Sequence, residues 1–169
     1  MVTVTLNDDD YQLAVRIGSQ RHKTMNGTSQ PSMPIIFEPA EHLIQNIRST
    51  AAEIAVARYL DTQWLGEQYG GPLGYDVFPN IEVRTRNVGK GLYIKDREVQ
   101  PGKYRKKPAD RFVLVWQTDN FQQFQLPGFI QLDYGWSRAE PWRKDGKLWG
   151  WQVNINDLWP IEKLKQTIA

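Results

Sequence analysis

Two carboxylates and an arginine lie close together in the chain, at Asp76, Glu82 and Arg84. Pro79 and Asn80 form a turn signal between the acidic residues, and β-branched residues surround Glu82, so this segment is predicted to form two short paired strands. Alternate residues of a strand point to the same face, which groups Glu82 with Arg84 and allows Asp76 to approach from the paired strand. Hard cations such as Mg²⁺ take oxygen ligands, commonly one or two carboxylates with water and phosphate. The spacing therefore predicts a divalent metal site beside a phosphate.

A third carboxylate, Glu53, lies on the apolar side of a predicted helix. The residues three, four and seven positions further along are Val56, Ala57 and Leu60, and they share a face with Glu53. A buried carboxylate is costly unless it is paired or binds a metal. Two other interpretations remain open, in which Glu53 is half-exposed at the edge of an amphipathic helix or pairs with a distant arginine.

Basic residues concentrate directly after the acidic pair. Between Arg84 and Arg111 the chain has ten Lys or Arg and three Asp or Glu, a net charge of +7, which leaves −5 for the rest of the chain. A positive segment of this kind can meet a polyanion, and the alternative is a solvated lysine-rich loop. The candidate nucleic-acid contacts are the cations Arg86, Lys90, Lys103, Arg105, Lys106 and Lys107.

Length and composition are those of an ordinary soluble protein, with 169 residues, 40% hydrophobic and 24% charged. The absence of cysteine excludes disulfides, thiolate zinc sites and cysteine nucleophiles. No apolar run approaches the about 18 residues of a membrane-spanning helix, and the N-terminus lacks the features of a secretory signal. We therefore expect a cytoplasmic protein with no membrane partner. The motifs of dinucleotide-binding proteins, P-loop ATPases, zinc proteases and serine hydrolases do not occur.

Hydrophobic periodicity predicts helices over residues 8–25 and 39–60. Ser49 and Thr50 favour helix caps, so the second of these helices is open to division in two. A closing helix is expected over 157–166, with Asn156 and Asp157 as its caps.

Strands are predicted mainly between these helices. Three short strands with two tight turns are expected within residues 74–95, and longer ones over 111–117, 124–132 and 148–155. Residues 133–147 are expected to form a loop, in which Asp145 and Gly146 make a turn. This order predicts a single α+β domain over 1–169, with a helical part at 8–60, a sheet core at 74–155 and the short helix at 157–166. Its centre is a mixed sheet of four to six strands flanked by helices.

The ordered segments AAEIAVARYL, GYDV, IEVRT, GLYI, FVLVW and PGFIQL, within residues 50–132, resemble the PD-(D/E)xK nuclease superfamily, most of all its small phage-borne members. The resemblance implies a restriction-endonuclease-like fold, in which a mixed four-stranded sheet lies between helices. Asp76 and Glu82 match the two motif carboxylates and Glu53 the helix glutamate, which together would bind Mg²⁺ or Mn²⁺. Arg84 stands where the family has lysine, and Lys90 or Lys95 is the alternative cation from the adjoining strand.

The resemblance implies a metal-dependent nuclease acting on DNA phosphodiester bonds, with Glu53, Asp76, Glu82, Arg84 and Lys95 as catalytic candidates. DNA is then the favoured partner, and the resemblance is compatible with a homodimer. If the protein is phage-encoded, it would act in the host cytoplasm. One alternative is a catalytically inactive module on the same fold that binds nucleic acid or a host protein, such as a phage factor that inhibits a host defence system. A second alternative is a structural component in which the charged residues form an ordinary salt-bridge network.

Overall fold

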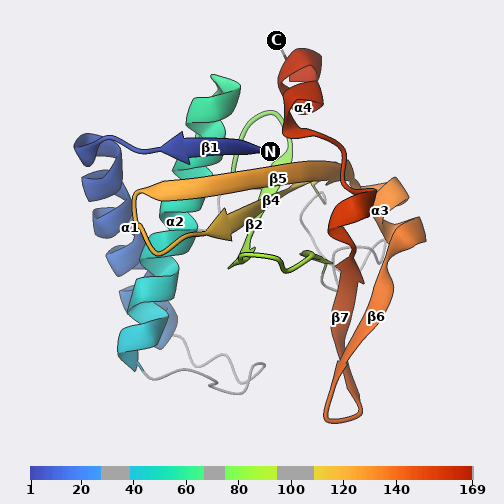
Figure 1. Ribbon diagram of the computed structural model, residues 1–169. Coiled ribbons are helices and arrows are strands. Elements are labelled where there is room, and N and C mark those ends of the chain that lie inside the picture. The colour runs from blue at the N-terminus through green and yellow to red at the C-terminus, as the bar shows by residue number, and fades with distance from the viewer. Residues whose placement is uncertain (28–38, 67–74, 95–108, 169) are drawn as a thin grey trace.

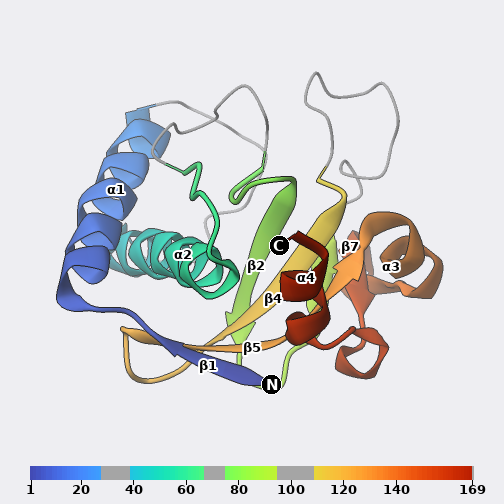
Figure 2. The ribbon, with the colours of Figure 1, turned by 90° about the horizontal axis from the view of Figure 1, so that it is seen from above.

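Helix α2 covers one face of a mixed four-stranded sheet, with α1 packed against α2, and a three-stranded sheet packs on the other side of the four-stranded one (Figure 1; Figure 2). The computed structural model describes residues 1–27, 39–66, 75–94 and 109–168. The described helices are α1 (Asp8–Gly27), α2 (Pro39–Leu60), α3 (Leu132–Arg138) and α4 (Ile161–Ile168), with a 3₁₀ turn at Ile155–Asp157. The described strands are β1 (Val2–Thr5), β2 (Ile81–Asn87), β3 (Leu92–Ile94), β4 (Arg111–Gln117), β5 (Gln123–Gln131), β6 (Glu140–Lys144) and β7 (Lys147–Val153). The predicted α+β class is confirmed.

The four-stranded sheet has the order β1-β5-β4-β2. Strands β2 and β4 are parallel, whereas β4–β5 and β5–β1 are antiparallel, so the predicted mixed sheet is confirmed. The central strand β4 is buried on both faces, as its nearly continuous apolar sequence predicts. Val113 and Val115 face α2, while Phe112 and Leu114 face the second sheet. Strand β2 lies at the edge of the four-stranded sheet, which leaves one side of it available to the functional residues.

Helix α2 runs without a break, so its division at Ser49 and Thr50 does not occur. The Thr50 hydroxyl donates a hydrogen bond of 2.8 Å to the Asn46 carbonyl within the helix instead of capping a new one. Helix α1 crosses α2 at Gly18, where a Cβ atom would lie 2.6 Å from the Ile47 Cα, so only glycine permits this approach. The two helices therefore form a tightly packed pair behind the sheet.

The second sheet, in the order β3-β7-β6, corrects two predictions. Strand β3 does not continue the sheet beside β2 but pairs antiparallel with β7, where Leu92 and Ile94 are fully buried against Val153. The predicted loop at 133–147 instead contains α3 and β6, whose hairpin with β7 turns at Asp145 and Gly146 as expected, both with positive φ.

The two ends of the chain also differ from expectation. The alternating residues Val2–Thr5 form β1, which the sequence analysis did not predict, and β1 pairs with β5. The closing helix begins at Ile161 rather than 157, because the Asn154 side chain caps the 3₁₀ turn that precedes it. Within the described residues, no helix combines the length and apolar character needed to cross a membrane.

Candidate functional site

A tight hairpin brings Asp76 beside Glu82. The first arm is an isolated bridge, in which the Ile81 amide donates to the Val77 carbonyl at 2.9 Å, and the Asp76 amide donates to the Ile81 carbonyl at 3.0 Å. The Asp76 Oδ2 atom accepts a hydrogen bond of 2.8 Å from the Val83 amide. Because β2 is an edge strand, this carboxylate takes up an amide that a neighbouring strand would otherwise bind. The predicted turn at Pro79–Asn80 and the approach of Asp76 to β2 are confirmed.

Glu82 and Arg84 share one side of β2, as alternation predicts, and Val83 packs into the core on the other side. The Arg84 Nη1 atom donates to Glu82 Oε1 at 2.6 Å, with the side chains 15% and 18% exposed. The Arg84 guanidinium carbon also lies 5.5 Å from the centre of the Phe112 ring. Arg84 is thus held beside the carboxylates and partly shielded from water, where a guanidinium can bind phosphate but cannot act as a base.

Glu53 is buried on α2, and its main partner is an arginine of α1. Arg21 binds it with both terminal nitrogens, Nη1 to Oε1 at 2.7 Å and Nη2 to Oε2 at 2.8 Å. The Trp64 indole donates to Oε2 at 3.0 Å. Trp64 itself forms a bridge with Val77, which ties Glu53 to the hairpin that carries Asp76. The structure therefore agrees with the interpretation in which Glu53 pairs with an arginine distant in sequence.

The three carboxylates influence one another electrostatically. The pKa of Asp76 is raised well above its ordinary value, first by burial and then by the negative charges of Glu53 and Glu82. The Val83 amide and the Arg84 charge act in the opposite direction, but they do not overcome these effects. Although some of the Asp76 side chain reaches solvent, protein atoms surround its carboxylate. The raised pKa therefore reflects an environment in which the ionised form of Asp76 is disfavoured.

The donor set around Asp76 suits a hard cation, since it consists of carboxylate oxygens. In the turn beside it, the buried Asn80 amide nitrogen donates to the Asp110 carboxylate, while the Asn80 Oδ1 atom has no hydrogen-bond partner. Across the described ranges, however, no three His, Cys, Asp or Glu side chains are grouped closely enough to hold a metal ion. The physical reason is visible in Glu53 and Glu82, each of which is turned toward an arginine.

The cations predicted to bind nucleic acid are separated. Arg86 continues the row of Glu82 and Arg84 along β2, whereas Lys90 is exposed in the turn beyond the strand. At about 3.3 Å per residue, the end of β2 is about 17 Å from Glu82, so Lys90 does not take the place of the motif lysine. Lys95 and the cations Lys103, Arg105, Lys106 and Lys107 lie outside the described residues.

Sequence reasoning missed two residues that shape the site, Arg21 and Trp64. A signal for Arg21 was present, because it follows Ala14, Ile17 and Gly18 on the buried stripe of α1, where an arginine needs a partner. No comparable local pattern indicated Trp64, whose role depends on the bridge to Val77.

Comparisons of the chain with protein-family models, with curated proteins and with solved structures each found no match.

Proposed function

We propose that the chain is a metal-dependent nuclease, or a nuclease-like domain, that acts on DNA phosphodiester bonds. The observation that carries the proposal is the hairpin that brings Asp76 beside Glu82 on the edge strand, where burial and the charges of Glu53 and Glu82 raise the pKa of Asp76. A divalent cation bound to Asp76 and Glu82 would offset the repulsion between these carboxylates and stabilise the ionised form of Asp76. The restriction-endonuclease-like arrangement of the resemblance is part of the proposal.

In this proposal Asp76 and Glu82 hold Mg²⁺ or Mn²⁺. Glu53, which is buried on α2 and paired with Arg21, adjusts the charge of the site. When bound, the metal supplies polarisation of the scissile phosphate and a lowered pKa for a bound water. Arg84 binds the phosphate oxygens and stabilises the negative charge that develops during cleavage. Trp64 fixes the orientation of the Glu53 carboxylate.

A second candidate is a non-catalytic module that binds nucleic acid or a host protein, such as a factor that inhibits a host defence system. It is favoured by the two arginine pairs, because Glu53 and Glu82 already have positive partners at 2.7 and 2.6 Å. On this alternative the protein has no metal affinity, and the substitution Glu82→Gln leaves its function intact.

Calorimetric titration with Mg²⁺ and Mn²⁺ distinguishes the two candidates. We expect the wild type to bind, and the double variant Asp76→Ala with Glu82→Ala to lose binding and all cleavage of DNA while it stays folded. The matched control is Asp133→Asn, which neutralises an exposed carboxylate on α3. A wild type without metal affinity would refute the nuclease and favour the binding module.

A further inference from the structure

Arg86 is a partly buried cation, and no acidic side chain of the described residues balances its charge. It is the third member of the row on β2, and among the described residues it pairs with no carboxylate, in contrast to Arg21 and Arg84. Burial lowers its pKa, which reflects the cost of keeping a guanidinium away from water. An anion bound to Arg86 would offset part of the free-energy cost of burying the guanidinium.

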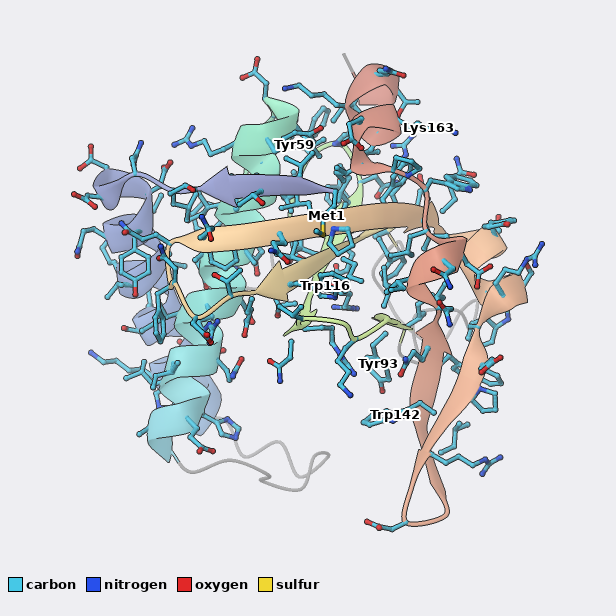
Figure 3. The ribbon with its side chains drawn as sticks, viewed as in Figure 1. Met1, Tyr59, Tyr93, Trp116, Trp142 and Lys163 are labelled. Atoms are coloured by element: carbon cyan, nitrogen blue, oxygen red, sulfur yellow. The ribbon has the colours of Figure 1, made fainter. Side chains whose placement is uncertain are left out.

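Two aromatic rings lie beside this guanidinium. The Arg86 guanidinium carbon is 5.9 Å from the ring centre of Tyr93 on β3 and 5.9 Å from that of Trp142 on β6. The rings meet edge to face, with centres 5.6 Å apart, and Figure 3 shows them side by side, on the side of the β6–β7 hairpin that faces the rest of the molecule. Both side chains remain partly exposed.

The position of Tyr93 is set by the strand opposite it. Gly150 of β7 pairs with Trp142, and a Cβ atom at Gly150 would lie 2.3 Å from the Tyr93 hydroxyl oxygen. The Tyr93 ring therefore lies directly against the glycine backbone, which keeps it beside Trp142. Because Tyr93 is held in this way, the two rings are preorganised and lose little conformational freedom when a ligand binds.

The two rings lie beside Arg86, at the opposite end of the row on β2 from Glu82. Glu82, Arg84 and Arg86 alternate on one side of β2, and four residues of strand span about 13 Å. Next to Trp142 on β6, Arg143 is exposed, and the β6–β7 hairpin projects from the rest of the molecule in Figure 1.

We infer that Arg86, Tyr93 and Trp142 form a subsite for an unpaired nucleotide, so that the nucleic acid bound here is single-stranded. Arg86 holds a backbone phosphate, and the Trp142 ring stacks on the base. Bases in a duplex are covered on both faces by their neighbours, whereas an unpaired base can stack on a protein ring. The inference rests on the proposed function, because it takes nucleic acid as the ligand. It adds that this nucleic acid is single-stranded, which the proposed function does not specify.

The test compares two single-stranded probes of equal length, a thymidine oligonucleotide and an abasic one that keeps the phosphates but lacks the bases. Binding to the full chain is measured by fluorescence anisotropy, at one salt concentration and with a chelator present so that no cleavage occurs. We expect the wild type to bind the thymidine probe about 5- to 150-fold more tightly, the range expected for one stacked base. Equal binding of the two probes, or binding of neither, would overturn the inference without reference to any variant.

Variants then locate the stacking ring. Trp142→Leu is expected to reduce affinity for the thymidine probe to that for the abasic probe, and Trp142→Phe to restore most of the difference. The matched control is Phe121→Ala, because Phe121 is also an exposed ring, 42% accessible, with an arginine, Arg48, at 4.8 Å from its centre. An unchanged preference in Trp142→Leu, or an equal loss in Phe121→Ala, would refute the assignment.

The result separates this inference from the nuclease itself. Base-dependent binding without metal-dependent cleavage would support the subsite and refute the nuclease. Cleavage that requires Asp76, combined with equal binding of the two probes, would support the nuclease and refute the subsite.

Discussion

The substitution Glu53→Gln tests whether the Glu53–Arg21 pair holds the two N-terminal helices together. Arg21 and Glu53 are only 12% and 9% exposed, and the variant removes the negative charge from this buried pair. Removal of one partner from a buried ion pair costs about 3–5 kcal/mol. Arg21 keeps two neutral acceptors, the Thr50 hydroxyl at 3.1 Å and the Gly66 carbonyl at 2.9 Å, and glutamine can accept one further bond. We therefore expect a loss near the lower limit, about 3 kcal/mol in the free energy of unfolding.

The chain offers a matched control in Arg58→Gln. Arg58 also joins the two helices, through Asp10, but its side chain is 64% exposed. Asp10 is only 8% exposed, but it lies in the first turn of α1, where the helix dipole also favours its negative charge, so this variant is expected to lose less than Glu53→Gln, about 1–2 kcal/mol.

The assay is urea unfolding followed by circular dichroism, with equal m-values required for a valid comparison. A double variant, Glu53→Gln with Arg21→Met, is expected to be more stable than the sum of the single losses predicts, because neither charge is then left alone. If Glu53→Gln costs no more than Arg58→Gln, the reasoning about the buried pair is wrong.

Two other predictions follow from the charges of the site. Asp76→Asn is expected to raise the melting temperature at pH 8. The raised pKa of Asp76 means that the folded wild type loses stability as the pH rises from about 4 through that pKa, whereas asparagine has no proton to lose and the variant keeps its stability. Its oxygen can still accept from the Val83 amide, and a lower melting temperature than that of the wild type at pH 8 would contradict this account. Separately, a variant with four alanines is expected to bind single-stranded DNA more weakly, with the slope of log affinity against log salt concentration flattened by about 0.7 per lost phosphate contact. Anisotropy against salt concentration measures this, with Lys163→Ala on α4 as the control, and unchanged binding would make the segment a solvated surface only. The four substituted residues are Lys103, Arg105, Lys106 and Lys107.

Most of the local structure could be predicted from the chain. The strand Arg111–Gln117, the two long helices and the turn at Asp145–Gly146 follow from patterns within a few residues of each other. The proximity of Asp76 and Glu82 could also be predicted, because two residues six positions apart on either side of a tight turn lie close together. Strand β1 had a visible alternation at Val2–Thr5, but four residues give little signal without their partner β5.

The sequence by itself determined the two long helices, the strand Arg111–Gln117 and the approach of Asp76 to Glu82 in the hairpin, because these depend on neighbours in the chain. Only the tertiary structure decided that Leu92–Ile94 pair with β7 and that Glu53 pairs with an arginine 32 residues away. It also decided that Arg86 lies beside Tyr93 and Trp142. Each of these contacts joins segments whose own patterns are compatible with several partners, and the choice depends on how apolar surface and charge are buried across the whole molecule.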